Sequence, residues 1–188
     1  MSAHDTPDWP WLARTPEVLG CHGAPVSTRD VLERVVGDVL EQLVGLSARA
    51  HIEPPLPGER CLFAHVGIRG ALTGVLSVAA PLALCVHMAR GVMDPATIAS
   101  DRTRAECAIA ELANVTAGRM VLDIEPIERT WLSPPAVVSP LLEEWVVLRG
   151  SNGTACFDVS GMPLLVLADV KGPAQPHAGY ATQAVTLS

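Results

Sequence analysis

The longest amphipathic pattern in the chain runs from residue 101 to residue 124. When successive residues are placed about 100° apart, the apolar side chains of this segment gather on one side and the polar ones on the other. The apolar side carries Ala105, Ile109, Leu112, Ala113, Thr116 and Met120, and the polar side carries Arg104, Cys107, Glu111, Asn114 and Gly118. The pattern predicts a long helix with a core face and a polar face.

Two further helices and a β-hairpin are predicted before this helix. Ser27 is a good N-cap for a first helix with an apolar stripe. Residues 61–68 and 72–78 are rich in β-favouring side chains and flank a turn at Gly70, which predicts an antiparallel hairpin. Pro81 then opens a short second helix, because proline is tolerated in a first helical turn.

A second hairpin is predicted near the C-terminal end. Residues 144–149 and 154–159 surround the turn sequence 151–153, Ser-Asn-Gly, and Asn-Gly accepts the positive φ angles of a tight hairpin. Residues 163–170 predict one more strand. Both strand predictions beside the Asn-Gly turn rest on local β-propensity.

The order of these elements defines a fold class. Pro134 and Pro135 predict a bend next to an edge or interrupted strand, which lies between the long helix and the second hairpin. Helix, hairpin, helix, helix, hairpin and strand together predict an α/β sandwich, with an antiparallel-rich sheet covered by helices. A parallel, doubly wound sheet is disfavoured.

The 188 residues are enough for one domain with a substantial core. We expect the domain at residues 26–170. Residues 1–25, which include Trp9 and Trp11, form an N-terminal arm, and residues 171–188, rich in Gly, Pro and Ala, form a C-terminal tail.

Composition excludes several functional classes. The net charge of −7 and the absence of a run of basic residues argue against a nucleic-acid partner. The five cysteines are widely spread without a C-x-x-C, which argues against a disulfide framework or a zinc site. No secretory signal and no apolar stretch of spanning length is present, so we expect a cytoplasmic protein without a membrane partner.

The common catalytic motifs are absent as well. The chain has no G-x-G-x-x-G after a strand, no Walker A sequence, no H-E-x-x-H and no G-x-S-x-G. Cys85 and His87 lie two apart and face different ways on a helix, which argues against a metal pair. His65 is expected to be structural.

The chemistry that remains lies on the long helix. Glu111 and Asn114 are three residues apart, so their Cβ atoms are about 5–6 Å apart and both side chains can address one small object outside the helix. Gly118 follows one turn later. A glycine inside a helix costs about 1 kcal/mol relative to alanine, which suggests close approach of a backbone or a partner.

The same residues resemble the signature of a known family. That signature is an acidic residue or serine, three residues, glutamate, two residues, asparagine, and a proline some twenty residues later. Here it corresponds to Cys107, Glu111, Asn114 and Pro135. With the hairpin and helix of residues 67–93, the chain resembles the chemotaxis phosphatases CheX and CheC over about residues 27–170, and CheX more closely.

The resemblance implies a CheC/CheX-like fold and a function. Family members hydrolyse the aspartyl phosphate of a CheY-type receiver domain of two-component signalling. The resemblance assigns catalysis to Asn114 and Glu111, with Asn114 orienting the attacking water and Glu111 pairing with the receiver's lysine. It assigns partner binding to Glu111, Gly118, Cys107 and Pro135. The chain needs no cofactor of its own, because Mg²⁺ is supplied by the receiver.

Several alternatives stay open at this point. Cys107 departs from the carboxylate or hydroxyl of the signature, which leaves a catalytically silent receiver-binding or scaffolding module as the alternative function. CheC carries a second motif in the first helix, but Glu41 is followed here by Val44, so one site is expected. The resemblance suggests a homodimer through the sheet, whereas the edge prolines favour a monomer.

Overall fold

The computed structural model describes residues 17–19, 25–50, 56–57, 60–92, 100–124, 130–140 and 142–171. The predictions for Trp9, Trp11 and the tail after Lys171 lie outside the described residues. At the boundary between the predicted arm and domain, β1 (Glu17–Leu19) pairs with β2 (Pro25–Ser27) in a short antiparallel ribbon that the sequence pattern did not predict.

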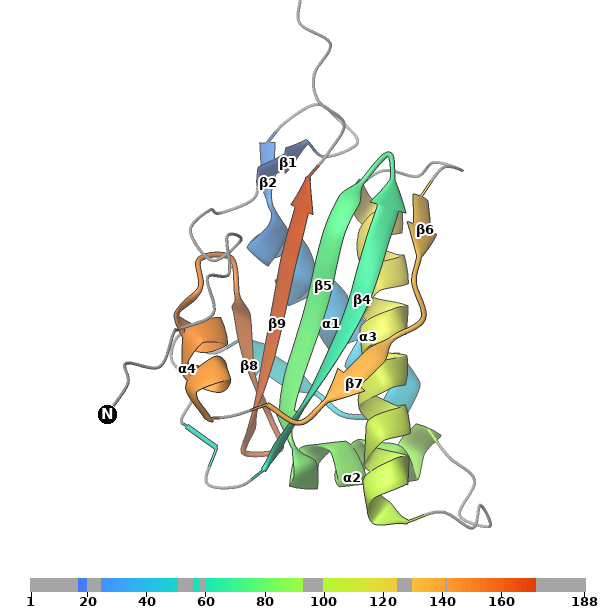
Figure 1. Ribbon diagram of the computed structural model, residues 1–188, viewed down its shortest axis with the longest axis vertical. Coiled ribbons are helices and arrows are strands. Elements are labelled where there is room, and N and C mark those ends of the chain that lie inside the picture. Colours follow the sequence, from blue (N-terminus) through green and yellow to red (C-terminus); the bar gives the residue numbers. More distant parts are fainter. Residues whose placement is uncertain are drawn as a thin grey trace, which may run out of the picture.

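In the described residues, seven strands form one antiparallel sheet (Figure 1). Their order is β3-β8-β9-β5-β4, and β6 and β7 both pair with the outer edge of β4. The strands are β3 (Ala48–Ala50), β4 (Cys61–Gly70), β5 (Thr73–Pro81), β6 (Thr130–Leu132), β7 (Ala136–Val138), β8 (Ala155–Val159) and β9 (Met162–Lys171). The predicted hairpin is confirmed as β4–β5, and β3 was not predicted.

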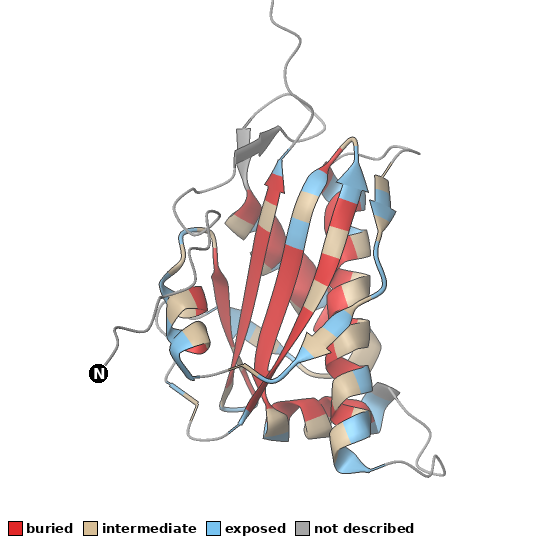
Figure 2. Ribbon diagram, in the orientation of Figure 1, coloured by how far each residue is buried: buried red, intermediate tan, exposed pale blue. Residues whose placement is uncertain are grey.

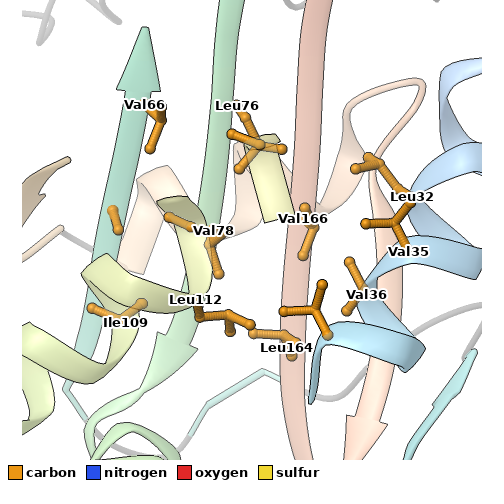
Figure 3. Packing of buried hydrophobic residues seen from close by; sticks show 14 of the residues in the cluster. Leu32, Val35, Val36, Val66, Leu76, Val78, Ile109, Leu112, Leu164 and Val166 are labelled. Atoms are coloured by element: carbon orange, nitrogen blue, oxygen red, sulfur yellow. The ribbon is translucent and has the colours of Figure 1, made fainter. Parts of the chain in front are cut away.

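Three helices cover one face of this sheet. They are α1 (Thr28–Val44), α2 (Leu82–Val92) and α3 (Asp101–Ile124), the helices predicted after Ser27, after Pro81 and over residues 101–124. Figure 3 shows side chains of α1 and α3 meeting those of β4, β5 and β9 in the main core. The α/β sandwich predicted from the sequence is therefore confirmed (Figure 2).

One prediction is wrong. Residues 144–149 form part of α4 (Leu142–Gly150) and not a strand. Glu143 and Glu144 lie in the first turn of α4, where carboxylates complement the helix dipole. At the other end, Ser151 Oγ donates to the Val147 carbonyl at 2.8 Å, and this bond satisfies an end carbonyl that a helix leaves open.

The hairpin in this region is not formed by residues 144–149 and 154–159, as predicted, but by β8 and the strand that follows it, β9. It joins β8 to β9 through Ser160 and Gly161, which have φ angles of 55° and 78°. Two successive positive φ angles are those of a two-residue turn whose twist matches the strands. Helix α4 packs on the opposite face of the sheet from α1 and α3, in a second cluster built around Trp145 (Figure 1).

The predicted interrupted strand is confirmed as β6 and β7. Pro134 and Pro135 separate the two pieces, and both pieces pair with β4. Between them, Ser133 N–H donates to the Gly67 carbonyl at 2.8 Å, and Gly67 N–H donates to Ser133 Oγ at 2.9 Å. The bend is thus held to the sheet by two hydrogen bonds.

Candidate functional site

Helix α3 begins where its sequence provides a cap. Ser100 Oγ accepts a hydrogen bond from the Thr103 N–H at 3.1 Å, which satisfies one of the open donors of the first turn. Asp101 adds a carboxylate beside the positive end of the helix dipole. The core face predicted from the sequence is buried along the whole helix (Figure 2).

Polar contacts hold both ends of α3 to neighbouring elements. Near the C-terminal end, Arg34 of α1 pairs with Asp123 at 2.8 Å, and Arg119 donates to Gln42 Oε1 at 2.8 Å. Near the N-terminal end, Arg102 pairs with Glu106 and donates to Ser139 Oγ, just after β7. Apart from the pair Arg102–Glu106 within the helix, these contacts join segments far apart in the chain, which is why sequence reasoning missed them.

The two residues proposed for catalysis lie on the outer side of α3. Glu111 and Asn114 are both half-buried, and neither is enclosed in the core. Within the described part of the chain, neither side chain makes a hydrogen bond or an ion pair. Two polar groups are thus held at the surface by a fixed helix, and both are available to a partner.

Gly118 lies beside β6. A Cβ added there would be 3.9 Å from Leu132 Cδ1, which is an ordinary van der Waals distance. The packing of α3 on β6 therefore tolerates a side chain at this position. Among the described residues no backbone approaches this position closely, so the close approach of a partner predicted from the sequence stays a prediction.

Pro135 is half-buried in the segment that joins β6 to β7, and both strands contact α3. The proline bend thus lies along the flank of the helix that carries Asn114. Cys107 is exposed one turn before Glu111. The four positions of the signature therefore lie on α3 and on the segment beside it. Their positions alone do not assign a chemical role to any of them.

The remaining reactive groups lie elsewhere. Cys61, Cys85 and Cys156 are buried, and burial raises the pKa of the Cys156 thiol. His65 contacts Ser77 Oγ through Nδ1 at 2.9 Å. No group of three side chains suited to holding a metal ion exists among the described residues. Among these residues, no helix is long and apolar enough to cross a membrane.

Helix α1 offers no equivalent of this arrangement. Glu41 is exposed, but Val44 packs against the main core. A Cβ on Gly91 of α2 would lie 3.0 Å from Val44 Cα, so α2 closely approaches that position. A valine in such a place has neither the polar group nor the access to orient water.

The sequence matches no protein-family model, and no curated protein matches it. Chemotaxis proteins are among the solved structures with a similar fold. A putative chemotaxis protein from Desulfovibrio vulgaris Hildenborough has a TM-score of 0.57 and 14% identity, over 82% of this chain and 99% of that chain. CheX from Desulfovibrio desulfuricans has a TM-score of 0.56 and 13% identity, over 77% of this chain and 99% of that chain.

A third similar structure is a complex. A chain of the CheX–CheY–BeF₃–Mg²⁺ complex from Borrelia burgdorferi has a TM-score of 0.54 and 14% identity, over 78% of this chain and 99% of that chain. The fold of this protein is therefore that of CheX-like chemotaxis proteins, and the resemblance noted in the sequence is confirmed for the fold.

Proposed function

We propose that this protein accelerates hydrolysis of the aspartyl phosphate of a CheY-type receiver domain. The observation that carries the proposal is the pair Glu111 and Asn114. Both side chains are accessible on the outer side of α3 and unengaged within the described residues, in a fold shared with CheX. One of the similar structures is a complex of CheX with CheY, BeF₃ and Mg²⁺, and this supports a receiver as the partner.

In the proposed reaction, Asn114 orients the attacking water. Its amide oxygen accepts a hydrogen bond from the water and so directs a lone pair of the water oxygen toward phosphorus. Phosphoryl transfer passes through a loose transition state in most accounts, so positioning contributes more than base strength. A neutral amide on a rigid helix suits this task.

Glu111 binds in the proposed complex and does not react. Its carboxylate pairs with the lysine of the receiver's active site, which places Asn114 beside the phosphoryl group. The receiver holds the Mg²⁺ that neutralises charge on the transferred group. This chain then needs only to supply the two side chains.

A silent receiver-binding module is the second candidate, and Cys107 is the observation that favours it. A thiol hydrogen-bonds more weakly than the carboxylate or hydroxyl that the signature has at this position. If that group supports Asn114 in a functional site, its loss leaves docking by Glu111 but lowers the rate of hydrolysis.

Two substitutions distinguish enzyme from binding module. Asn114→Ala is expected to slow loss of phosphate from a receiver by about 10²-fold or more while binding changes little, because positioning is lost and docking is kept. Glu111→Ala is expected to weaken binding by about 2–5 kcal/mol, because the receiver's lysine is left unpaired. Receivers encoded in the same genome are phosphorylated, and phosphate release and affinity are measured separately.

Glu143→Ala on α4 is the matched control, since Glu143 is an exposed carboxylate on the opposite face of the sheet. Glu143→Ala should change neither the rate of phosphate release nor the affinity for the receiver. If wild type binds a receiver without accelerating phosphate loss, and Cys107→Ser does not create activity, the enzyme proposal is wrong and the binding module stands.

A further inference from the structure

Four residues of α3 form one line along its outer side. Arg104, Glu111, Gly118 and Leu122 fall within about 40° of each other around the helix axis. None of the four is buried, and Leu122 is 62% exposed. We call this line the α3 ridge. Glu111 and Gly118 lie near its middle, and Arg104 and Leu122 are its ends.

The N-terminal end of the ridge carries a positive charge without an internal partner. Arg102 and Arg119, the other arginines of α3, are engaged with Glu106 and Gln42 respectively. Within the described residues, the Arg104 side chain has no such partner. The ridge therefore presents a cation at Arg104 and a carboxylate at Glu111, about 10 Å apart along the axis.

The C-terminal end of the ridge is apolar. A single exposed leucine is ordinary on a protein surface. Leu122, however, lies on the same line as Glu111, one turn after Gly118 and about 16 Å further along the helix axis than Glu111. Gly118 places no side chain between Glu111 and Leu122, and Leu132 Cδ1 of β6 would lie 3.9 Å from a Cβ at that position.

We propose that Arg104 and Leu122 select the receiver that docks on α3. This inference rests on the proposed function. The surface around an aspartyl phosphate is acidic, because proteins hold Mg²⁺ at phosphate with carboxylates. A chain of net charge −7 would repel such a surface unless a local cation opposed it.

The ridge thus specifies the chemistry of its partner. The matching receiver presents an acidic group opposite Arg104, a cation opposite Glu111, and a small apolar side chain opposite Leu122. A receiver with a basic group opposite Arg104 is rejected, since like charges brought together at an interface oppose binding.

The test uses the full chain and the receiver domains encoded in the same genome, each activated with beryllofluoride and Mg²⁺. Arg104→Glu is expected to raise the Kd of the best-bound receiver more than tenfold at low salt, and less at about 1 M salt, where the Debye length is about 3 Å. Leu122→Gln keeps a good helix former and is expected to raise Kd about fivefold at both salt concentrations.

Matched controls lie away from the ridge. Arg49→Glu changes an exposed arginine of β3, and Leu142→Gln changes a leucine of α4 that is 53% exposed. Neither should change Kd. With phosphorylated receiver, both ridge variants should raise KM and retain kcat, because Asn114 and Glu111 are untouched.

The outcomes separate this inference from the proposed function. If wild type binds a receiver but hydrolyses nothing, the Kd pattern still tests the ridge. If wild type hydrolyses the phosphate and the ridge variants match the controls, the inference is wrong and the proposed function stands. Absence of binding to every activated receiver overturns both.

Discussion

The side chains of Glu111 and Asn114 are presented by a helix whose position is already determined. Arg34 and Arg102 tie its two ends to α1 and to the segment after β7. Docking a rigid helix costs less conformational entropy than ordering a loop. In the proposed complex, a receiver that docks on α3 therefore meets groups that need little rearrangement.

His65 lies on the face of the sheet that carries α4, away from α3. It is half-buried, and burial lowers its pKa from the ordinary value, an effect that nearby Glu144 partly opposes. Below about pH 6.5, His65 of the unfolded chain binds a proton, whereas His65 of the folded chain binds it less readily because its pKa is lowered. We therefore expect the free energy of unfolding to fall as pH decreases from about 7 toward 5.

The contribution of His65 is measured by urea unfolding across this pH range. His65→Gln should flatten part of the decrease, because glutamine does not titrate, and His87→Gln controls for the loss of one histidine. Phosphate loss at pH 7 should be unchanged in His65→Gln. Parallel pH profiles for wild type and His65→Gln would assign the acid sensitivity to other groups.

At the scale of elements, β5 must approach β9 closely at Gly74. A Cβ at this position would overlap the carbonyl oxygen of Asp169 and lie 2.8 Å from Val170 Cα. Backbone atoms in a paired strand cannot move aside without loss of register. The glycine is thus required by the pairing of β5 with β9.

Gly74→Ala is expected to destabilise the protein by at least about 1–3 kcal/mol, the usual cost of overpacking. Gly37→Ala is the contrasting variant, because a Cβ at Gly37 of α1 meets nothing within 4 Å. It should stabilise by about 1 kcal/mol through helix propensity. Chemical denaturation measures both, and equal effects of the two substitutions would contradict the packing argument.

The long helix α3 was predicted well from the sequence, whereas the short helix α4 and the three-residue strands β1, β2 and β3 were not. Helix α3 has enough turns for its apolar face to be recognised, so its bounds match the prediction. Helix α4 buries only Trp145 and Leu148, and its Trp, Val and Leu side chains locally favour strands. Its last turn also receives a hydrogen bond from beyond the helix, which Thr154 Oγ1 donates to the Leu148 carbonyl at 2.7 Å.

The same distinction holds for the candidate site. Glu111 and Asn114 could be placed together because their spacing is local. The flank of the site depends on pairs such as Gly67 with Ser133, far apart in sequence. Propensity and periodicity contain no information on such pairs, so only the fold reveals them.

At the scale of the whole molecule, the two faces of one sheet carry separate side-chain clusters. The main core lies between the sheet and α1, α2 and α3. The candidate site lies on the outer side of α3. The second cluster lies under α4 and contains Trp145, Phe63 and Leu165. Stability contributed by the second cluster should therefore be separable from the receiver chemistry proposed for α3.

Trp145 provides the test of this separation. Its side chain is fully buried, and its Nε1 donor has no hydrogen-bond partner among the described residues. Trp145→Ala is expected to cost about 3–5 kcal/mol of stability, as for other large core truncations. Trp145→Phe should cost less than half of that, because it keeps a ring in the cluster and removes a buried donor that lacks a partner.

Urea unfolding followed by circular dichroism measures both costs, and phosphate loss from a receiver is measured under conditions where each variant is folded. The two faces share strands but no side-chain cluster, so we expect both Trp145 variants to retain the wild-type rate. A folded Trp145→Ala protein that loses activity as Asn114→Ala does would show that α4 controls α3 through the sheet, and the expected separation would then be wrong.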